Sequence, residues 1–238
     1  MPFSGCQNCN TGCDAVCTRS GCNSDCHLST VASDISISNS YTIDDNKQVV
    51  LTPNGCTYPK IVVNGDLTIS TYASIIAEPM PSACNGASSG GTGGAAGGSY
   101  WTTGGYLVAD ESVPGLMRGG SAGEGSGSGL GGGVIDIEVT GTLFLYGSIQ
   151  ANGEGATAST GGGGSGGSIR IKCAELRGDT PGRIEANGGT GSAGGGGGAG
   201  GEVTIDSPSV LFPTAFIFTR GALGGVFICL CMYTCMCV

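Results

Sequence analysis

The chain has 238 residues, of which 49 are glycine, and charged residues make up only 11% of it. This composition excludes an ordinary globular chain and a charge-rich disordered chain. Collagen is excluded as well, because glycine runs such as residues 161–164 break its rule of one glycine at every third residue. The formal net charge of −9 argues against a nucleic-acid partner, since phosphate binding requires clustered Lys and Arg.

Residues 1–29 form a cysteine cluster with almost no aliphatic side chains. So short a polar stretch cannot build a core, and its cysteines therefore predict a small disulfide-stapled module, which resembles the cysteine-rich repeats of extracellular receptors. The alternative is a zinc site that combines the Cys6-x-x-Cys9 pair with Cys22, Cys26 or His27. Even spacing, rather than two separated pairs, favours disulfides. The cysteines of the predicted module are Cys6, Cys9, Cys13, Cys17, Cys22 and Cys26.

The total of 13 cysteines indicates an oxidising compartment, and hence an extracellular or cell-surface protein. No secretory signal precedes them, because residues 1–5 carry neither a basic region nor an apolar run. We therefore expect either a fragment of a longer secreted chain or a sequence whose start is misplaced.

Residues 30–78 are predicted to form short β-strands, because aliphatic side chains alternate with polar ones at a period of two. The turn dipeptides Asn54-Gly55 and Asn64-Gly65 separate these strands. Cys56 and Cys84 flank the second coil and are placed to form a disulfide. The alternating pairs are Ile35/Ile37, Tyr41/Ile43, Val49/Leu51, Ile61/Val63 and Leu67/Ile69.

Residues 79–133 are a long Gly/Ser/Ala insertion in the predicted solenoid, which spans 30–220. It holds one group of aromatic side chains, Tyr100, Trp101 and Tyr106. Their rings could anchor the loop to the side of the coil or stack on a sugar ring. We favour the anchor and keep a glycan contact as the functional alternative.

A regular repeat occupies residues 134–220. Its first strands begin at Val134, Ser168 and Glu202, 34 residues apart, and a glycine run precedes each of them. A fixed period is the mark of a solenoid, whose units must stack because one unit cannot bury an apolar face alone. Successive units should pair in parallel, with strands roughly 4.8 Å apart. Two further strands per unit are predicted, around Leu143/Leu145 and around Ile149 or Ile184.

Alternation within the repeat assigns each side chain to the inside or the outside of the coil. Ile137 and Ile171 should lie in one buried row, and Cys173 should be a buried, inert thiol. Outside, basic residues between positions 170 and 183 alternate with acidic ones, which predicts a mixed, solvated face. The predicted inward residues are Ile135, Ile137, Val139, Ile169, Ile171, Cys173, Val203 and Ile205.

The glycine runs should leave the coil as long loops that lie side by side, because backbones without side chains can pack closely. The phrase at 141–153, followed by a glycine loop and the residues 166–171, resembles right-handed parallel β-helix proteins of the pectin-lyase-like type. More narrowly, it is similar to glycine-rich repeats in large secreted and cell-surface proteins of protists and bacteria. The resemblance covers about residues 30–220 and implies an all-β fold, but that architecture hosts lyases, hydrolases, adhesins and stalks.

Residues 221–238 form an uncharged tail rich in Cys, Met, Tyr and Val, just long enough for a membrane span. The same residues are what a TG/TA-rich non-coding repeat would encode. We therefore interpret the tail as a gene-model artefact, either a translated intron or a frame error. A tail anchor or a palmitoylated segment is the alternative, and a membrane is a partner only if the tail is genuine.

Little in the sequence supports catalysis. His27 is the only histidine and lies in the cysteine cluster, which argues against a Ser-His-Asp or Cys-His site. Polysaccharide hydrolases need carboxylates gathered on one face. The exterior carboxylates of this chain, Asp66, Asp136, Glu138 and Asp206, are instead spread along the coil. No glycine run carries the residues of a calcium-binding repeat or a phosphate loop, so we expect no catalytic residue, metal site or cofactor.

These features predict a structural or adhesive segment of a large extracellular or cell-surface protein, with carbohydrate or matrix proteins as partners. A carbohydrate-active β-helix enzyme and a membrane-anchored surface antigen are the alternatives. An enzyme should show a groove with clustered acidic and basic side chains, whereas a stalk should show dispersed ones.

Overall fold

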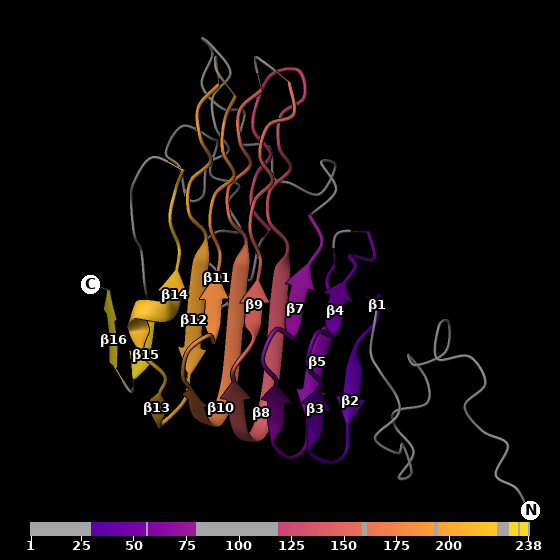
Figure 1. Cartoon of the computed structure of the whole chain (residues 1–238), viewed down its shortest axis with the longest axis vertical. Helices are drawn as coiled ribbons and strands as arrows, with labels where there is room; N and C mark the ends of the chain where they lie inside the picture. The colour runs from indigo at the N-terminus through magenta and orange to yellow at the C-terminus, as the bar shows by residue number, and fades with distance from the viewer. Residues whose placement is uncertain are drawn as a thin grey trace, which may run out of the picture.

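A computed structural model describes residues 30–55, 57–79, 119–158, 161–192, 195–222, 229–232 and 234–237. These residues form an all-β coil, in which each turn of the chain lays new strands beside those of the turn before (Figure 1). Within them the one helical element is η2, a 3-10 turn at Thr214–Phe216. None of the helices in this part of the chain has the length and apolar character needed to cross a membrane.

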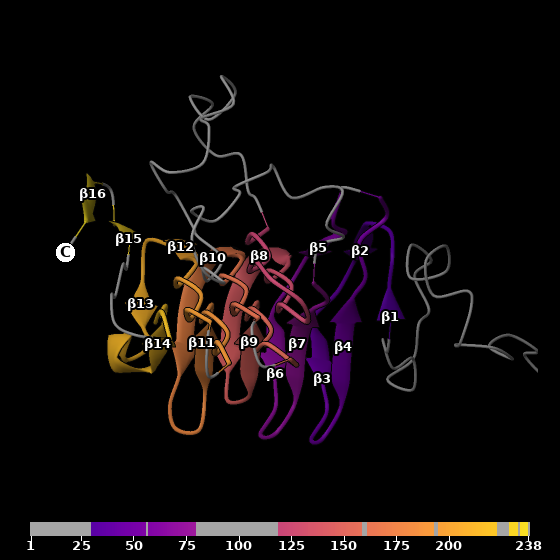
Figure 2. The same ribbon diagram turned by 90° about the horizontal axis from the view of Figure 1, so that it is seen from above.

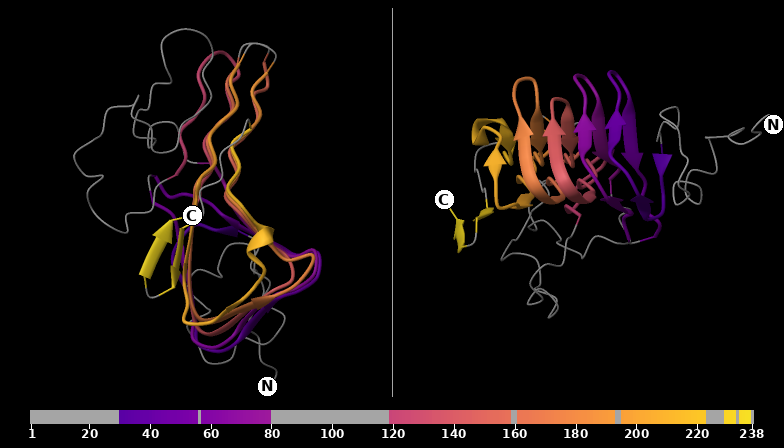
Figure 3. Two further views of the ribbon diagram at one scale, coloured as in Figure 1. Left: turned by 90° about the vertical axis from the view of Figure 1, so that its left-hand side faces the viewer. Right: turned by 90° about the horizontal axis from the view of Figure 1, so that it is seen from below.

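The coil has a three-sided outline when viewed along the stack (Figure 3). The first side holds β2 (Ile35–Ile37), β5 (Lys60–Val63), the first halves of β8 (Val134–Leu145) and β10 (Ser168–Gly178), and β12 (Glu202–Asp206). The second holds β3 (Tyr41–Ile43), β6 (Leu67–Ile69), the second halves of β8 and β10, and β13 (Val210–Leu211). The third is a separate sheet of β1 (Thr30–Val31), β4 (Gln48–Leu51), β7 (Ser74–Ala77), β9 (Ser148–Gln150), β11 (Arg183–Glu185) and β14 (Ile217–Phe218).

Strands of successive coils pair in parallel and in the predicted register. Ser168 pairs with Val134 on one side and with Glu202 on the other, which confirms the 34-residue period. Beyond β12, β15 (Cys229–Met232) continues the sheet in parallel, and β16 (Thr234–Cys237) turns back antiparallel to β15. Sequential stacking of parallel strands in two sheets is the arrangement of a parallel β-helix.

Aliphatic side chains fill the inside of the coil in rows that run along the stack. Ile61, Ile137, Ile171 and Ile205 form one such row, since each pairs with the next and all are buried. Cys173 is a free, buried cysteine, as predicted, and its burial raises the pKa of the thiol. Cys173 pairs with Val139 in a neighbouring row, where it contributes packing as a small apolar side chain.

At the corner between the first two sides, β8 carries one residue more than β10. Val139 pairs with Cys173, but the next pair joins Thr142 to Glu175, so the register shifts there. Gly141 lies in this bulge, and a Cβ at this position would lie only 2.2 Å from Asp66 Oδ1. A side chain at residue 141 would therefore push the bulge away from the neighbouring coil.

Glycine-rich segments rise together from the corner between the third and first sides (Figures 1 and 2). We call these segments the glycine limbs, and they lie side by side, as expected from the sequence. Part of the predicted insertion joins them, because residues 119–133 supply two limbs that precede β8. The described limbs are 119–124, 128–133, 151–157, 161–167, 186–192 and 195–201.

Candidate functional site

Most of the predicted site residues lie outside the described part of the chain. The predicted disulfide residues and their zinc alternative, as well as the predicted glycan contact, therefore remain predictions. They are Cys6, Cys9, Cys13, Cys17, Cys22, Cys26, Cys56 and Cys84 for the disulfides, and Tyr100, Trp101 and Tyr106 for the glycan contact.

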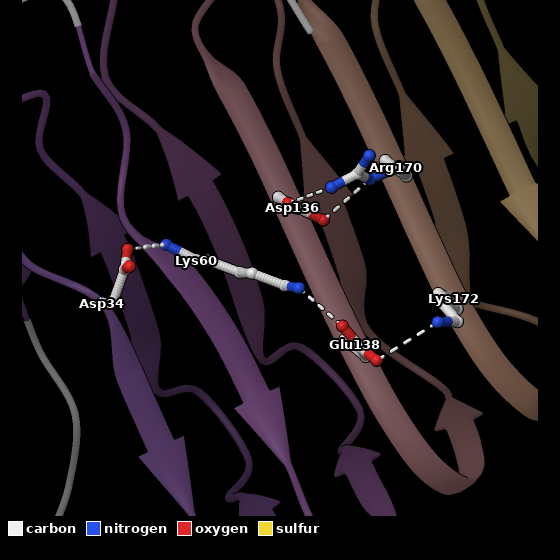
Figure 4. Close-up of polar contacts among 6 residues, drawn as sticks. All are labelled: Asp34, Lys60, Asp136, Glu138, Arg170 and Lys172. Atoms are coloured by element: carbon white, nitrogen blue, oxygen red, sulfur yellow. Dashed lines mark hydrogen bonds and ion pairs between the residues drawn. The ribbon is translucent and has the colours of Figure 1, made fainter. Parts of the chain in front are cut away.

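Charged side chains on the first side of the coil pair across adjacent turns (Figure 4). The guanidinium of Arg170 donates two hydrogen bonds to Asp136, with Nε 3.0 Å from Oδ1 and Nη2 2.5 Å from Oδ2. The 34-residue period places these two residues directly opposite each other on β8 and β10. A planar fork on a carboxylate fixes both side chains, so this pair ties one coil to the next.

Glu138 joins three coils. Its Oε2 lies 2.5 Å from Nζ of Lys60 on β5, and its Oε1 lies 3.3 Å from Nζ of Lys172 on β10. The backbone N–H of Lys60 in turn donates to Asp34 Oδ1 at 2.8 Å. The hydrogen bond from Lys60, followed by that from Lys172, holds the pKa of the Glu138 carboxyl below its ordinary value. The carboxylate is therefore stabilised in its charged form.

These contacts refine the prediction of a solvated face. Arg170 and Lys172 do lie outside, but each is paired with a carboxylate of the coil before it. The spacing of 34 residues could have indicated this, because it sets Asp136 against Arg170 and Glu138 against Lys172.

Other exterior carboxylates also hold neighbouring coils. Asp66 Oδ1 accepts a hydrogen bond of 2.7 Å from the backbone N–H of Thr142, one coil further on. Glu175 accepts hydrogen bonds from Arg177 and from the Ser209 hydroxyl of the following coil. These two carboxylates therefore take part in contacts within and between coils.

Asparagines form a ladder at the base of the limbs. Asn152 Oδ1 accepts a hydrogen bond of 2.8 Å from the backbone N–H of Asn187. Asn187 Oδ1 in turn accepts one of 2.9 Å from the backbone N–H of Arg220. The Ala-Asn-Gly phrases at 151–153 and 186–188 are therefore the junctions where two successive coils pass into limbs.

The hydrogen bonds of limb 161–167 repeat with a period of three. The N–H groups of 162 and 165 donate to limb 119–124, those of 163 and 166 to limb 195–201, and those of 164 and 167 to limb 151–157. Three residues per turn is the geometry of a polyproline II helix, which has no internal hydrogen bonds and so turns its groups outward. Limb 161–167 is thus the centre of a bundle of such helices.

Carbonyl groups of the same limb point to other neighbours. Those of 162 and 165 accept from limb 128–133, while those of 161 and 164 accept from limb 186–192. Five described limbs therefore surround the central one and are joined to it by backbone hydrogen bonds.

Close contact explains why these limbs consist of glycine. Their glycines have negative φ, apart from Gly125 and Gly127 at and near the tip between two limbs. A Cβ on Gly164 would lie 2.0 Å from the carbonyl oxygen of Leu130, and one on Gly167 would lie 1.8 Å from that of Gly133. Ordinary residues could adopt the backbone conformation but would not fit between the limbs.

Ser165 is a buried polar residue inside the bundle. Ser165 is fully buried, and its Oγ accepts a hydrogen bond of 2.7 Å from the backbone N–H of Ser121. The N–H of Ser165 donates back to the carbonyl of Ser121 at 2.9 Å. This reciprocal contact fixes limb 119–124 against the central limb.

Comparison with known proteins finds no matching family model, curated protein or solved structure. Within the described residues, no group of three or more His, Cys, Asp or Glu side chains could hold a metal ion. The chemistry that these residues do offer is backbone hydrogen bonding in the limbs and paired charges on the coil.

Proposed function

We propose that this chain is a structural or adhesive segment of a large extracellular or cell-surface protein, and that it is not an enzyme. The observation that carries the proposal is that polar groups are paired between successive coils. The described ion pairs of Asp136 and Glu138 and the hydrogen bonds of the limbs join one coil to the next. Groups that are paired in this way stiffen a stack, and a carboxylate that cations hold in its ionised form is a poor general acid.

The proposal also includes the handedness and type of the β-helix and the disulfide module that precedes it. We infer a right-handed β-helix of the pectin-lyase-like type, because crossovers between parallel strands are nearly always right-handed. We further infer that residues 1–29 form a disulfide-bonded module, which fits an oxidising compartment. Carbohydrate or matrix proteins are the proposed partners, and the acidic chain is not suited to nucleic acid.

The main alternative is a carbohydrate-active enzyme. Such an enzyme needs an acid and a base or nucleophile about 5–9.5 Å apart beside one glycosidic bond. Asp136 and Glu138 are instead neutralised by Arg170 and by two lysines, which favours the structural function.

A screen of the full chain against pectins, alginates and β-glucans tests the proposal, with cleavage and binding measured separately. We expect no turnover, and we expect that any weak binding falls in Trp101→Ala. Cleavage that is lost in Asp136→Asn but kept in Asp45→Asn, a change at an exposed turn, would establish the enzyme instead.

A further inference from the structure

Limb 119–124 lies in a groove between two other limbs, and its hydrogen bonds show which groups line that groove. This limb lies against limbs 128–133 and 161–167. Its Gly120 and Gly123 N–H groups donate to the carbonyls of Gly132 and Gly129, at 2.7 and 2.9 Å. Its carbonyls at 121 and 124 accept from Ser165 and Gly162, at 2.9 and 2.8 Å. Two carbonyl acceptors on limb 128–133 and two N–H donors on limb 161–167 therefore hold limb 119–124 as an extended segment.

The 34-residue period repeats this groove one coil further on. The acceptors Gly129 and Gly132 correspond to Gly163 and Gly166, and the donors Gly162 and Ser165 correspond to Gly196 and Ala199. The limbs themselves confirm the correspondence. Gly129 and Gly132 donate to the carbonyls of residues 162 and 165, just as Gly163 and Gly166 donate to those of residues 196 and 199.

In this second groove the four groups have no hydrogen-bond partner among the described residues. They are the carbonyls of Gly163 and Gly166 and the N–H groups of Gly196 and Ala199. Five described limbs are hydrogen bonded to limb 161–167, and these four groups border a sixth position beside that limb. Gly163 and Gly166 are buried at its floor, while Gly196 and Ala199 are partly exposed at its wall. Backbone N–H and carbonyl groups that are buried without a hydrogen bond cost free energy, so a ligand that pairs with them is favoured.

We propose that this second groove binds an extended, glycine-rich segment of another polypeptide chain. The required sequence follows from the first groove, where a Cβ on Gly120 or Gly123 would lie 2.4 or 2.2 Å from a carbonyl oxygen of the central limb. Glycine is therefore needed at every third position of the ligand, in a helix of three residues per turn. The inference goes beyond the proposed function, because it rests on the hydrogen-bond geometry of the limbs alone.

Amide hydrogen exchange of the full chain, followed by NMR, tests the proposal residue by residue. The probe is a synthetic peptide with the sequence of limb 119–124, Gly-Gly-Ser-Ala-Gly-Glu, in two tandem copies. At saturation it should slow exchange at Gly196 and Ala199 about tenfold or more, because both N–H groups become hydrogen bonded. Exchange at Gly162 and Ser165, which already donate to limb 119–124, should not change.

Two controls separate the proposed contact from a general effect. A peptide with alanine at the second and fifth positions of each copy should give no protection, because its methyl groups would meet the carbonyls. Ala199→Pro removes one N–H while keeping a φ suited to this helix, and should abolish binding, whereas Ala199→Ser should bind as the wild type does.

Three results would overturn the proposal. The first is unchanged exchange at Gly196 and Ala199 with the peptide present. The second is equal protection by the alanine peptide, which requires no variant of the protein and so is independent of folding defects. The third is protection of Gly196 and Ala199 without peptide, to the level of Gly162 and Ser165, because it would show that a segment of the same chain fills the groove.

Discussion

Asp136 and Arg170 are 34 residues apart in the chain and face each other on adjacent coils, where the guanidinium of Arg170 spans both carboxylate oxygens. A purely solvated face predicts no effect of reversing one of these charges. The observed pair predicts that Arg170→Asp lowers the free energy of unfolding by about 1 kcal/mol, since it also sets two carboxylates side by side.

Restoring the pair with opposite polarity tests this directly. Adding Asp136→Arg to Arg170→Asp should recover part of the loss, as measured by chemical denaturation in a double-mutant cycle. Strictly additive effects of the two substitutions would show that the pair contributes nothing.

The buried row gives a much larger effect one residue away. Ile171 is fully buried between Ile137 and Ile205, so Ile171→Asp should place a charge in an apolar interior. We expect a loss of more than about 3 kcal/mol, against about 1 kcal/mol for the control Ile171→Val. If Ile171→Asp and Arg170→Asp destabilised the protein equally, the assignment of inside and outside faces would be wrong.

Acid should weaken the contact between coils at Glu138. Lys60 and Lys172 lower the pKa of this carboxyl in the folded protein, so its ionised form contributes stability above the ordinary pKa of glutamate. That contribution is lost as the pH falls through the lowered pKa.

Denaturation at a series of pH values measures this contribution. The difference in stability between the wild type and Glu138→Gln should be present at neutral pH and disappear in acid. In a background of Lys60→Met and Lys172→Met, the difference should be small at every pH. A difference that grows as the pH falls would contradict the assigned sign.

Much of the coil could be predicted from sequence because its signals are periodic. The spacing of Val134, Ser168 and Glu202 set the register, and alternation placed Ile137 and Ile171 inside. The limbs carry no such signal, since a run of glycines has no side chains to show a period. Their three-residue repeat is visible only in which neighbour each N–H group meets. From sequence alone, residues 119–133 are therefore indistinguishable from the rest of the Gly/Ser/Ala insertion.

The role of glycine in the bundle can be tested with one methyl group. Gly164 lies in the central limb, where a Cβ would meet the Leu130 carbonyl oxygen at 2.0 Å, whereas at Gly221 the nearest atom would lie at 3.3 Å. Gly164→Ala should therefore force limbs 128–133 and 161–167 apart, at a cost of about 1–3 kcal/mol. Gly221→Ala should be nearly neutral. Amide exchange measures the effect locally. Gly129 and Gly132, which donate from limb 128–133 to limb 161–167, should exchange faster in Gly164→Ala, while amides of the buried coil such as Ile171 should not. Unchanged exchange at Gly129 and Gly132 would mean that the bundle tolerates side chains, and that close backbone packing is not the reason for its glycines.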